Sequence, residues 1–515
     1  MKKYRIIAIA LLCTIVLSAM AACDNTADGD DSAQGSQVTA PVQAGADGNG
    51  TSDPSGDQTG GEVVEVPTLL PEGTWYDGAE FYILVSGNFR NNDFKTEDAD
   101  TPVNQAKYRR LATLQEKYGI GFKTYDIIGF NTANGAGKGY NELQKSYNSA
   151  SYEYDAAMVG TYDVSTAAYS GYLTDLNSDA MSYIDLTKSW WDKRANESLM
   201  IDGKMFYTTG DISLTDNIIT NCIMFNKALI ASQDDMRDPY EMVKNNEWTW
   251  DNFTTEVKKF SIDLDGNDVM DHNDAYGLLT WNDAFLAAFS SARQSFAVIN
   301  DSNEIQLSIY SQRSVSMVNK YIDLIRDSKS VYNYQVLDQD QWDTVRVDMF
   351  NNDQAVYSMT TFNTIPKHRD SETDFGILPF PKYSADQENY GHLVSAYHCQ
   401  FLCVPYYVDN AERTSGLLEE LAYMGKTDLT PAYYQQTLVG QYVRDDESVE
   451  MLDIIFSSAM YDIGIYYKIG GLSSSVMTMA KTKQNTFASI YDAARQSAEN
   501  DIKQINDTFR ELLGQ

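Results

Sequence analysis

Cysteine is scarce in this chain of 515 residues, which contains only five. Cys399 and Cys403 are four positions apart in a predicted strand, about 13 Å at the usual rise per residue, so they are too far apart for a disulfide. His392 and His398 lie nearby, but the spacing of these four side chains fits no standard zinc site. We therefore expect Cys222, Cys399 and Cys403 to be buried apolar residues rather than bridges or metal ligands.

Basic side chains are also few, with 39 Lys and Arg against 73 Asp and Glu, which gives a formal net charge of −34. So negative a chain would repel phosphates, which argues against nucleic-acid partners and against binding to anionic lipid surfaces. The chain has only 4 His, and it contains no HExxH, GxSxG or phosphate-loop motif. A pair of carboxylates for glycan cleavage remains an alternative, because many Asp and Glu residues are available.

The first residues read MKKYRIIAIALLCTIVLSAMAAC. A basic start followed by a short apolar run predicts a signal peptide over residues 1–22, and the run is too short for a membrane span. The small pair Ala21–Ala22 before Cys23 resembles a bacterial lipobox. This resemblance implies cleavage before Cys23, a diacylglyceryl group on its thiol, and anchoring at the outer face of the cytoplasmic membrane. The alternative is a secreted protein in which this cysteine is incidental.

Residues 23–66 differ in composition from the rest of the chain. After Cys23 they contain no Lys, Arg or aromatic residue and are rich in Asp, Gly, Ala, Ser, Thr and Gln. Such a segment cannot bury enough apolar area to offset its chain entropy. We therefore expect a disordered acidic tether with a reach on the order of 35–40 Å.

The body of the chain begins with alternating strands and helices. We predict a strand at 79–87, a helix at 102–118, a second helix at 141–150 and a strand at 154–160. The first helix has Thr101 as its cap, Pro102 at its first position and Gly119 after its end. This order predicts an α/β fold with a parallel sheet, and the last hundred residues are mostly helical.

Several short motifs resemble, in their order, the extracellular solute-binding proteins of ATP-binding cassette (ABC) importers, the sugar-binding group in particular. They are GKMFY at 203–207, FNK at 225–227, WTWDNF at 248–253, an acidic loop at 263–274 and GILPFPK at 376–382. At two positions Phe stands where the family has Tyr. The resemblance extends over about 450 residues, behind the lipobox and the tether.

The resemblance implies a two-lobed fold of the type II periplasmic-binding class, with a hinge between the lobes. The expected N-terminal lobe is 67–180 and 340–410, and the expected C-terminal lobe is 181–339 and 411–515. It implies a monomer without a required cofactor that captures a carbohydrate, with an oligosaccharide as the main expectation, and delivers it to a permease without catalysis. The alternatives are a glycan-binding adhesin or sensory module, and a polysaccharide-cleaving enzyme.

The solute site is predicted from a rule for open α/β sheets, in which ligands lie beyond the carboxyl ends of the strands. The residues just past the predicted strands, or just before one in the case of the last, are Asn88, Phe89, Tyr162, Asp163, Asp211, Trp281, Phe362, Asn363 and Tyr397. We expect Asp163 and Asp211 to accept hydrogen bonds from sugar hydroxyls, and Trp281 to stack on a sugar ring. For each single residue the alternative is a loop side chain that makes local bonds.

The stretch DLDGNDVMDHND has the ligand spacing of a twelve-residue calcium loop. Its candidate ligands are the side chains of Asp263, Asp265, Asn267, Asp271 and Asp274, and the carbonyl of Val269. A helix precedes the loop but a strand follows it, and the loop is single, so any calcium here would be structural. The alternative is an acidic surface turn held by Asx hydrogen bonds.

Overall fold

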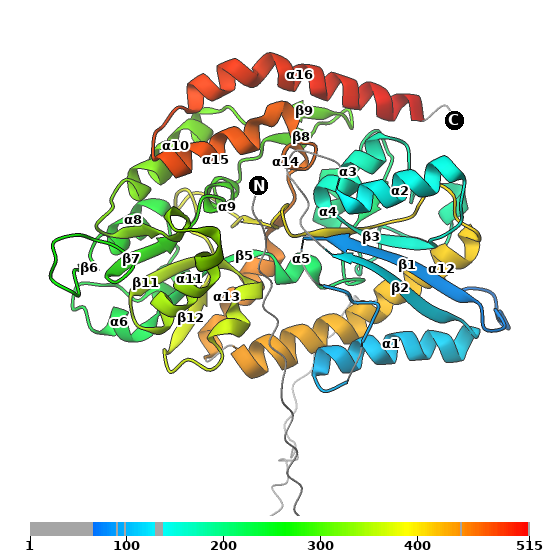
Figure 1. The fold of residues 1–515 in the computed structure, drawn as a ribbon, viewed down its shortest axis with the longest axis horizontal. Helices are drawn as coiled ribbons and strands as arrows, with labels where there is room; N and C mark the ends of the chain where they lie inside the picture. The colour runs from blue at the N-terminus through cyan, green and yellow to red at the C-terminus, as the bar shows by residue number, and fades with distance from the viewer. Residues whose placement is uncertain (1–64, 89–90, 97–98, 129–136, 443–444, 513–515) are drawn as a thin grey trace, which may run out of the picture. The chain divides into compact units, whose positions relative to one another are not determined.

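The structure is a computed structural model that describes residues 65–88, 91–96, 99–128, 137–442 and 445–512. These described residues form one compact unit (Figure 1). The predicted signal peptide 1–22, the predicted lipidation site Cys23, all but the last two residues of the tether, and Phe89 lie outside the described residues. Within the described ranges, no helix is both long and apolar enough to cross a membrane.

The first sheet contains the early strands of the chain. Its strands, in spatial order, are β2 (Gly121–Ile128), β1 (Glu80–Gly87), β3 (Ala156–Gly160), β14 (Gln400–Cys403) and β4 (Tyr207–Thr208). β1 pairs in parallel with β2 and β3, and α1 (Pro102–Tyr118) and α2 (Lys138–Ser149) connect these strands. The predicted start of α1 is confirmed, because the Thr101 hydroxyl accepts a hydrogen bond from the Asn104 amide at 3.1 Å.

The second sheet holds the strands of the middle of the chain. In spatial order they are β10 (Val331–Asn333), β7 (Ala275–Thr280), β11 (Ala355–Thr361), β5 (Asn221–Asn226) and β12 (Phe375–Leu378), and β6 (Ser261–Ile262) pairs with β7. β7 pairs in parallel with β10 and β11, whereas β5 runs antiparallel to β11 and β12. The helices of this region include α8 (Trp250–Val257), α9 (Ala284–Ser291), α10 (Gln312–Ile325) and α11 (Trp342–Asn351).

The strands that pair in each sheet do not all come from the chain segments that we assigned to one lobe. β11 and β12 fall in the segment 340–410 that we assigned to the N-terminal lobe, yet they pair with β5 in the second sheet. β4 falls in the segment 181–339, yet it pairs with β14 in the first sheet. All these strands are buried along their whole length, so their sequences carry no alternation that would indicate which sheet they join.

The chain runs from the first sheet to the second through residues 209–220 and returns through residues 379–399. In the return segment, β13 (His392–Leu393) pairs in parallel with β15 (Ala459–Met460). The predicted helical C-terminal part is confirmed and contains α12 (Ala411–Met424), α13 (Asp446–Ser457), α14 (Ile463–Tyr466), α15 (Leu472–Thr482) and α16 (Phe487–Glu511). α16, red in Figure 1, packs against both α15 and α3 (Thr161–Tyr169).

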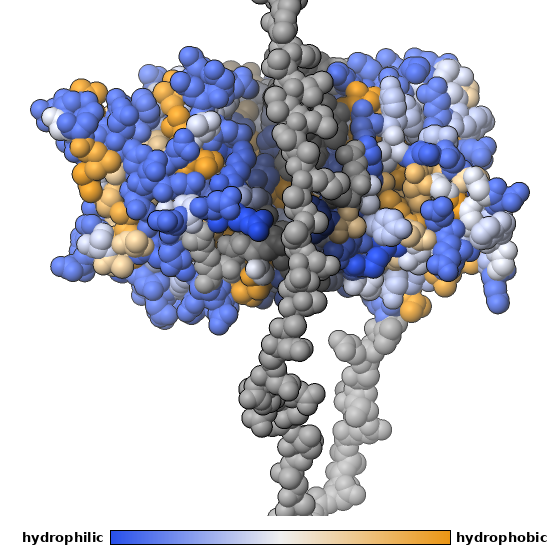
Figure 2. All heavy atoms as spheres, turned by 60° about the horizontal axis from the view of Figure 1, so that its bottom comes forward, coloured by the Kyte–Doolittle hydropathy of each residue, from blue (hydrophilic) through white to orange (hydrophobic). Residues whose placement is uncertain are grey.

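Four of the seven tryptophans are buried in the core. Trp190 and Trp191 are buried and donate their indole hydrogens to Glu419 at 3.1 and 2.9 Å, while burial raises the pKa of that carboxyl to about 7. Trp248 and Trp250 are buried as well. Cys222, Cys399 and Cys403 are free and buried, which confirms their apolar packing role. By contrast, the face shown in Figure 2 is mostly hydrophilic, in keeping with the large net charge.

Candidate functional site

A cavity of about 290 Å³, named here the edge cavity, lies where strand ends from both sheets meet. Tyr162 reaches it from the first turn of α3, two residues after the end of β3 in the first sheet. Trp281 follows β7 and Asn363 follows β11 of the second sheet. Asn221 begins the antiparallel strand β5 and pairs with Thr361, so it lies at the same edge. The carboxyl ends of parallel strands thus meet at one place, as ligand sites of open α/β folds require.

Four further segments complete the wall of the edge cavity. The crossover between β13 and β14 contributes Ser395, Ala396, Tyr397 and His398. The start of α9 contributes Asp283 and Leu286, and α11 contributes Arg346. The segment from α14 to α15 contributes Lys468, Ser473, Ser474 and Met477. The cavity is therefore lined by both sheets, by a crossover and by the C-terminal helices.

The lining combines aromatic faces with amide groups. Tyr162, Trp281 and Tyr397 supply rings, and Asn221 and Asn363 supply donors and acceptors. The Asn88 amide donates a 2.8 Å hydrogen bond to the carbonyl of Tyr397, which ties β1 to the crossover segment. A few placed polar groups among aromatic rings suit a sugar, whose C–H faces pack on rings while its hydroxyls form hydrogen bonds at the rim.

Three charged side chains of the edge cavity, Asp283, Arg346 and Lys468, were absent from the sequence prediction. Burial raises the pKa of Asp283 to about 6, and within the described part of the chain its carboxylate has no hydrogen-bond partner. The Lys468 ammonium lies 4.6 Å from the centre of the Tyr162 ring, and burial lowers its pKa. Asp283 follows Trp281 by two positions, so the strand-end rule could have included it. Lys468 follows a helix, where that rule gives no signal.

The structure brings together four of the predicted solute residues, Tyr162, Trp281, Asn363 and Tyr397, in the wall of the edge cavity. A fifth, Asn88, contacts the backbone of Tyr397.

Asp163, Asp211 and Phe362 are not among the residues that line the edge cavity, so their role as solute ligands stays a prediction. The Asp163 carboxylate, 4% exposed, accepts backbone hydrogen bonds from Gly137, Gly139 and Tyr140 at 2.8, 3.1 and 3.3 Å. It therefore satisfies the first turn of α2.

The other two predicted residues also make local contacts. Asp211 accepts a 2.6 Å hydrogen bond from the Thr430 hydroxyl, and burial raises its pKa to about 6. Phe362 is buried and stacks on Phe456, with 4.8 Å between ring centres. The strand ends were placed correctly, but the residues next to a strand end point in opposite directions, and only some of them face the cavity.

The acidic loop supports both interpretations offered for it. Asp263, Asp265 and Asp274 each offer a carboxylate oxygen, and these oxygens lie within 4.8 Å of one another. The side chains of Asp265, Asn267 and Asp271 accept hydrogen bonds from the amides two residues further on, at 3.1, 2.7 and 2.8 Å, as Asx turns require. The Asp263 carboxylate accepts hydrogen bonds from the amides of Gly266 and Asp268 at 2.7 and 2.8 Å. A carboxylate oxygen that accepts an amide hydrogen keeps a lone pair for a cation. The structural calcium site therefore fits this loop and stays a prediction.

Chelation gives the test of this calcium site. If calcium binds, a chelator should lower the melting temperature of the protein, because an ion that binds only the folded state stabilises it. Asp263→Ala should melt at a lower temperature and should no longer respond to the chelator, since it loses a ligand. Differential scanning calorimetry with and without chelator measures both effects. An unchanged melting temperature of the wild type, together with metal-free purified protein, would favour the Asx turn.

The fold is that of the two-lobed periplasmic binding proteins, which confirms the predicted fold class. The structure is similar to the cyclic alpha-maltosyl-1,6-maltose binding protein from Arthrobacter globiformis, with a TM-score of 0.54 and 14% identity over 83% of this chain and 99% of that one. It is also similar to a cyclo/maltodextrin-binding protein complexed with maltotetraose, with a TM-score of 0.52 and 13% identity over 84% of this chain and 97% of that one.

A third similar structure is UgpB from Mycobacterium tuberculosis in complex with glycerophosphocholine, with a TM-score of 0.51 and 16% identity over 82% of this chain and 99% of that one. The first two of these solved structures are named as binding proteins, and the third holds a bound small molecule. No protein-family model matches the sequence, and no curated protein does. At these identities the likeness establishes the fold, and the ligand has to be argued from the site.

Proposed function

We propose that this protein captures a carbohydrate in the edge cavity and presents it to an ABC permease, without catalysing a reaction. The observation that carries the proposal is the composition of that cavity, in which Tyr162 comes from the first sheet and Trp281 from the second. A ligand that touches both can hold the two sheets in one relative position. This is the arrangement that ligand-driven domain closure needs.

In this mechanism a sugar ring packs on Trp281, and its hydroxyls bind the polar groups beside that ring. Asp283 accepts a hydroxyl hydrogen, because its carboxylate has no partner within the described ranges. Asn363 and Lys468 lie in the same wall and supply donors. The bound sugar favours the closed arrangement only by its extra contacts in that state, and the permease then recognises this arrangement.

The position of the protein in the cell follows from the same proposal. Cleavage before Cys23 and lipidation of its thiol would anchor the chain, and residues 24–66 would hold the binding unit away from the bilayer. Mass spectrometry of the mature N-terminus tests this prediction. A diacylglyceryl group on Cys23 is expected, and an unmodified terminus at another residue would contradict it.

A thermal-shift screen with monosaccharides and oligosaccharides tests the binding function. A carbohydrate that binds only the folded protein should raise the melting temperature, and at a concentration 100 times its Kd the stabilisation is about 2.7 kcal/mol. Analysis of the same mixtures for cleavage products separates binding from hydrolysis. A panel without any thermal shift would contradict the carbohydrate proposal, and released products would favour the enzyme.

A further inference from the structure

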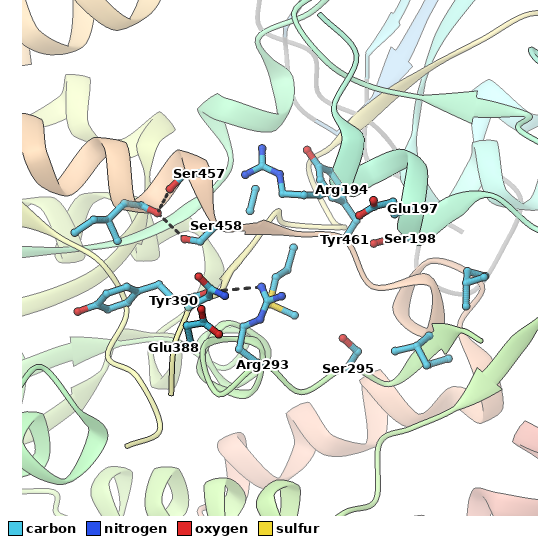
Figure 3. Close-up of a pocket in the computed structure, with 17 residues that line it drawn as sticks. Arg194, Glu197, Ser198, Arg293, Ser295, Glu388, Tyr390, Ser457, Ser458 and Tyr461 are labelled. Carbon is cyan, nitrogen blue, oxygen red and sulfur yellow. Dashed lines mark hydrogen bonds between the residues drawn. The ribbon is translucent and has the colours of Figure 1, made fainter. Parts of the chain in front are cut away.

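A second cavity, of about 750 Å³, is named here the arginine cavity and is drawn in Figure 3. Its walls come from α4 (Lys193–Leu199), the segment after α9, the loop at 388–390, and the end of α13 together with β15. It shares no lining residue with the edge cavity. The proposed carbohydrate function makes no use of it.

Arg194 is held in a fixed orientation at this cavity. Its Nε and Nη2 donate to the two carboxylate oxygens of Asp192 at 3.2 and 2.7 Å, and its Nη1 donates to the carbonyl of Phe456 at 2.6 Å. Asp192 is in turn fixed, because it caps α4 and accepts a 3.0 Å hydrogen bond from the Tyr461 hydroxyl. A guanidinium carries five donor hydrogens, so two remain for another partner.

Arg293 projects from the facing wall (Figure 3) and has few partners. Its only hydrogen bond from the side chain, within the described part, is a long one of 3.4 Å from Nη1 to the carbonyl of Tyr390. No carboxylate oxygen of the described residues lies within 4.0 Å of its guanidinium nitrogens. Its backbone is left-handed, with φ of 57°, a conformation that is uncommon for a residue other than glycine and is often found at functional sites.

The packing next to Arg293 depends on a glycine. A Cβ at Gly391 would lie 2.4 Å from the Ser290 carbonyl oxygen and 3.1 Å from the Arg293 Cδ. Because Gly391 has no side chain, the chain before β13 can lie close to the end of α9 and to the aliphatic part of the Arg293 side chain. The arginine is thus positioned by close packing, although its charged group is exposed to the cavity.

The convergence of two arginines is unusual in so acidic a protein. Burial and repulsion from the Arg194 guanidinium lower the pKa of Arg293, which indicates that the two positive charges act on each other. Glu197 and Glu388 also line the cavity, but neither lies within 4.0 Å of either guanidinium. Two guanidinium groups therefore face the same cavity, and one of them has no acidic partner. Guanidinium groups bind oxyanions through several hydrogen bonds in one plane, so this pair suits an oxyanion ligand.

We propose that the arginine cavity is a second binding site, which takes a small ligand through a phosphate, sulfate or carboxylate group held between Arg293 and the free donors of Arg194. The hydroxyls of Ser198 and Ser295 line the same cavity and can bind the remaining oxygens or hydroxyls of that ligand. Arg194 belongs to a helix that packs on β4 of the first sheet, and Arg293 follows a helix that packs on α10 beside the second sheet. A bound anion would therefore connect the two parts of the molecule at a place other than the carbohydrate site.

Isothermal titration calorimetry of the purified protein at constant ionic strength tests this site. The probes are inorganic phosphate, sulfate and glucuronate, and glucose is the uncharged control. At least one anion should bind, and Arg293→Gln should weaken that binding tenfold or more. Arg293→Lys should retain part of it, because an ammonium keeps the charge but not the two-pronged geometry. Binding of phosphate or sulfate would identify a free oxyanion as ligand, and binding of glucuronate alone would identify an acidic sugar.

Arg495→Gln is the matched control, because Arg495 is an exposed arginine on α16 that pairs with Glu499 at 2.7 Å. It should leave anion binding unchanged. Arginine modification by phenylglyoxal gives a second readout on the wild type, in which the bound anion should protect Arg293 but not Arg495. Failure of all three anions to bind, or equal affinity for wild type and Arg293→Gln together with no protection, would overturn the proposal.

Discussion

Replacing Trp281 by alanine should weaken carbohydrate binding by roughly 1–3 kcal/mol, about a 5- to 150-fold loss of affinity. The indole follows β7, is half-buried and lies in the wall of the edge cavity. It is the largest aromatic face there, so its removal takes away the surface on which a sugar ring would pack. Isothermal titration calorimetry with a carbohydrate selected by the thermal-shift screen measures the loss.

Trp75→Ala is the control for this experiment. Trp75 is 61% exposed and lies outside the wall of the edge cavity, so its removal should leave the affinity unchanged. A quenching or shift of tryptophan fluorescence on binding should also disappear in Trp281→Ala and remain in Trp75→Ala. Equal affinities of wild type and Trp281→Ala would place the carbohydrate elsewhere.

Replacing Asp163 by alanine should lower the free energy of unfolding by about 2–4 kcal/mol, because buried amides at the start of α2 would lose their acceptor. The carboxylate accepts hydrogen bonds from Gly137, Gly139 and Tyr140. Asp163→Asn should cost less, since the amide oxygen can still accept. Urea denaturation followed by circular dichroism measures both losses.

Asp301→Ala serves as the control for the loss of an aspartate, because Asp301 is exposed in a turn and should change stability little. The result also decides between two roles for Asp163. If Asp163 serves to cap α2, Asp163→Ala should lower the stability and largely retain the carbohydrate affinity. Unchanged stability with much weaker carbohydrate binding would restore the role of solute ligand that the sequence pattern had indicated.

Local signals in the sequence were sufficient for the elements and for the fold class. Thr101, Pro102 and Gly119 mark the ends of α1 because capping depends on neighbouring residues. The sequence could not predict that β11 and β12 pair with β5, because this pairing depends on contacts between segments that are distant in the chain and buried along their whole length. The predicted lobe boundaries therefore failed at the strands whose partners are far away in the chain.

The same limit explains the mixed outcome at the candidate site. The strand-end rule selected Tyr162 and Trp281, which line the edge cavity, because position relative to a strand can be read from the sequence. It could not separate Tyr162 from Asp163, since that distinction depends on the direction in which each side chain leaves the first turn of α3. Lys468 enters the edge cavity from the segment between α14 and α15, which only the tertiary packing brings there.

The measurement that tests the central claim most directly is a crystal structure of the protein with a carbohydrate that raises its melting temperature. We expect the sugar in the edge cavity, with a ring against Trp281 and its hydroxyls within hydrogen-bond distance of Asp283 and Asn363. A sugar bound in the arginine cavity, or on the surface away from the strand ends, would contradict the proposed site.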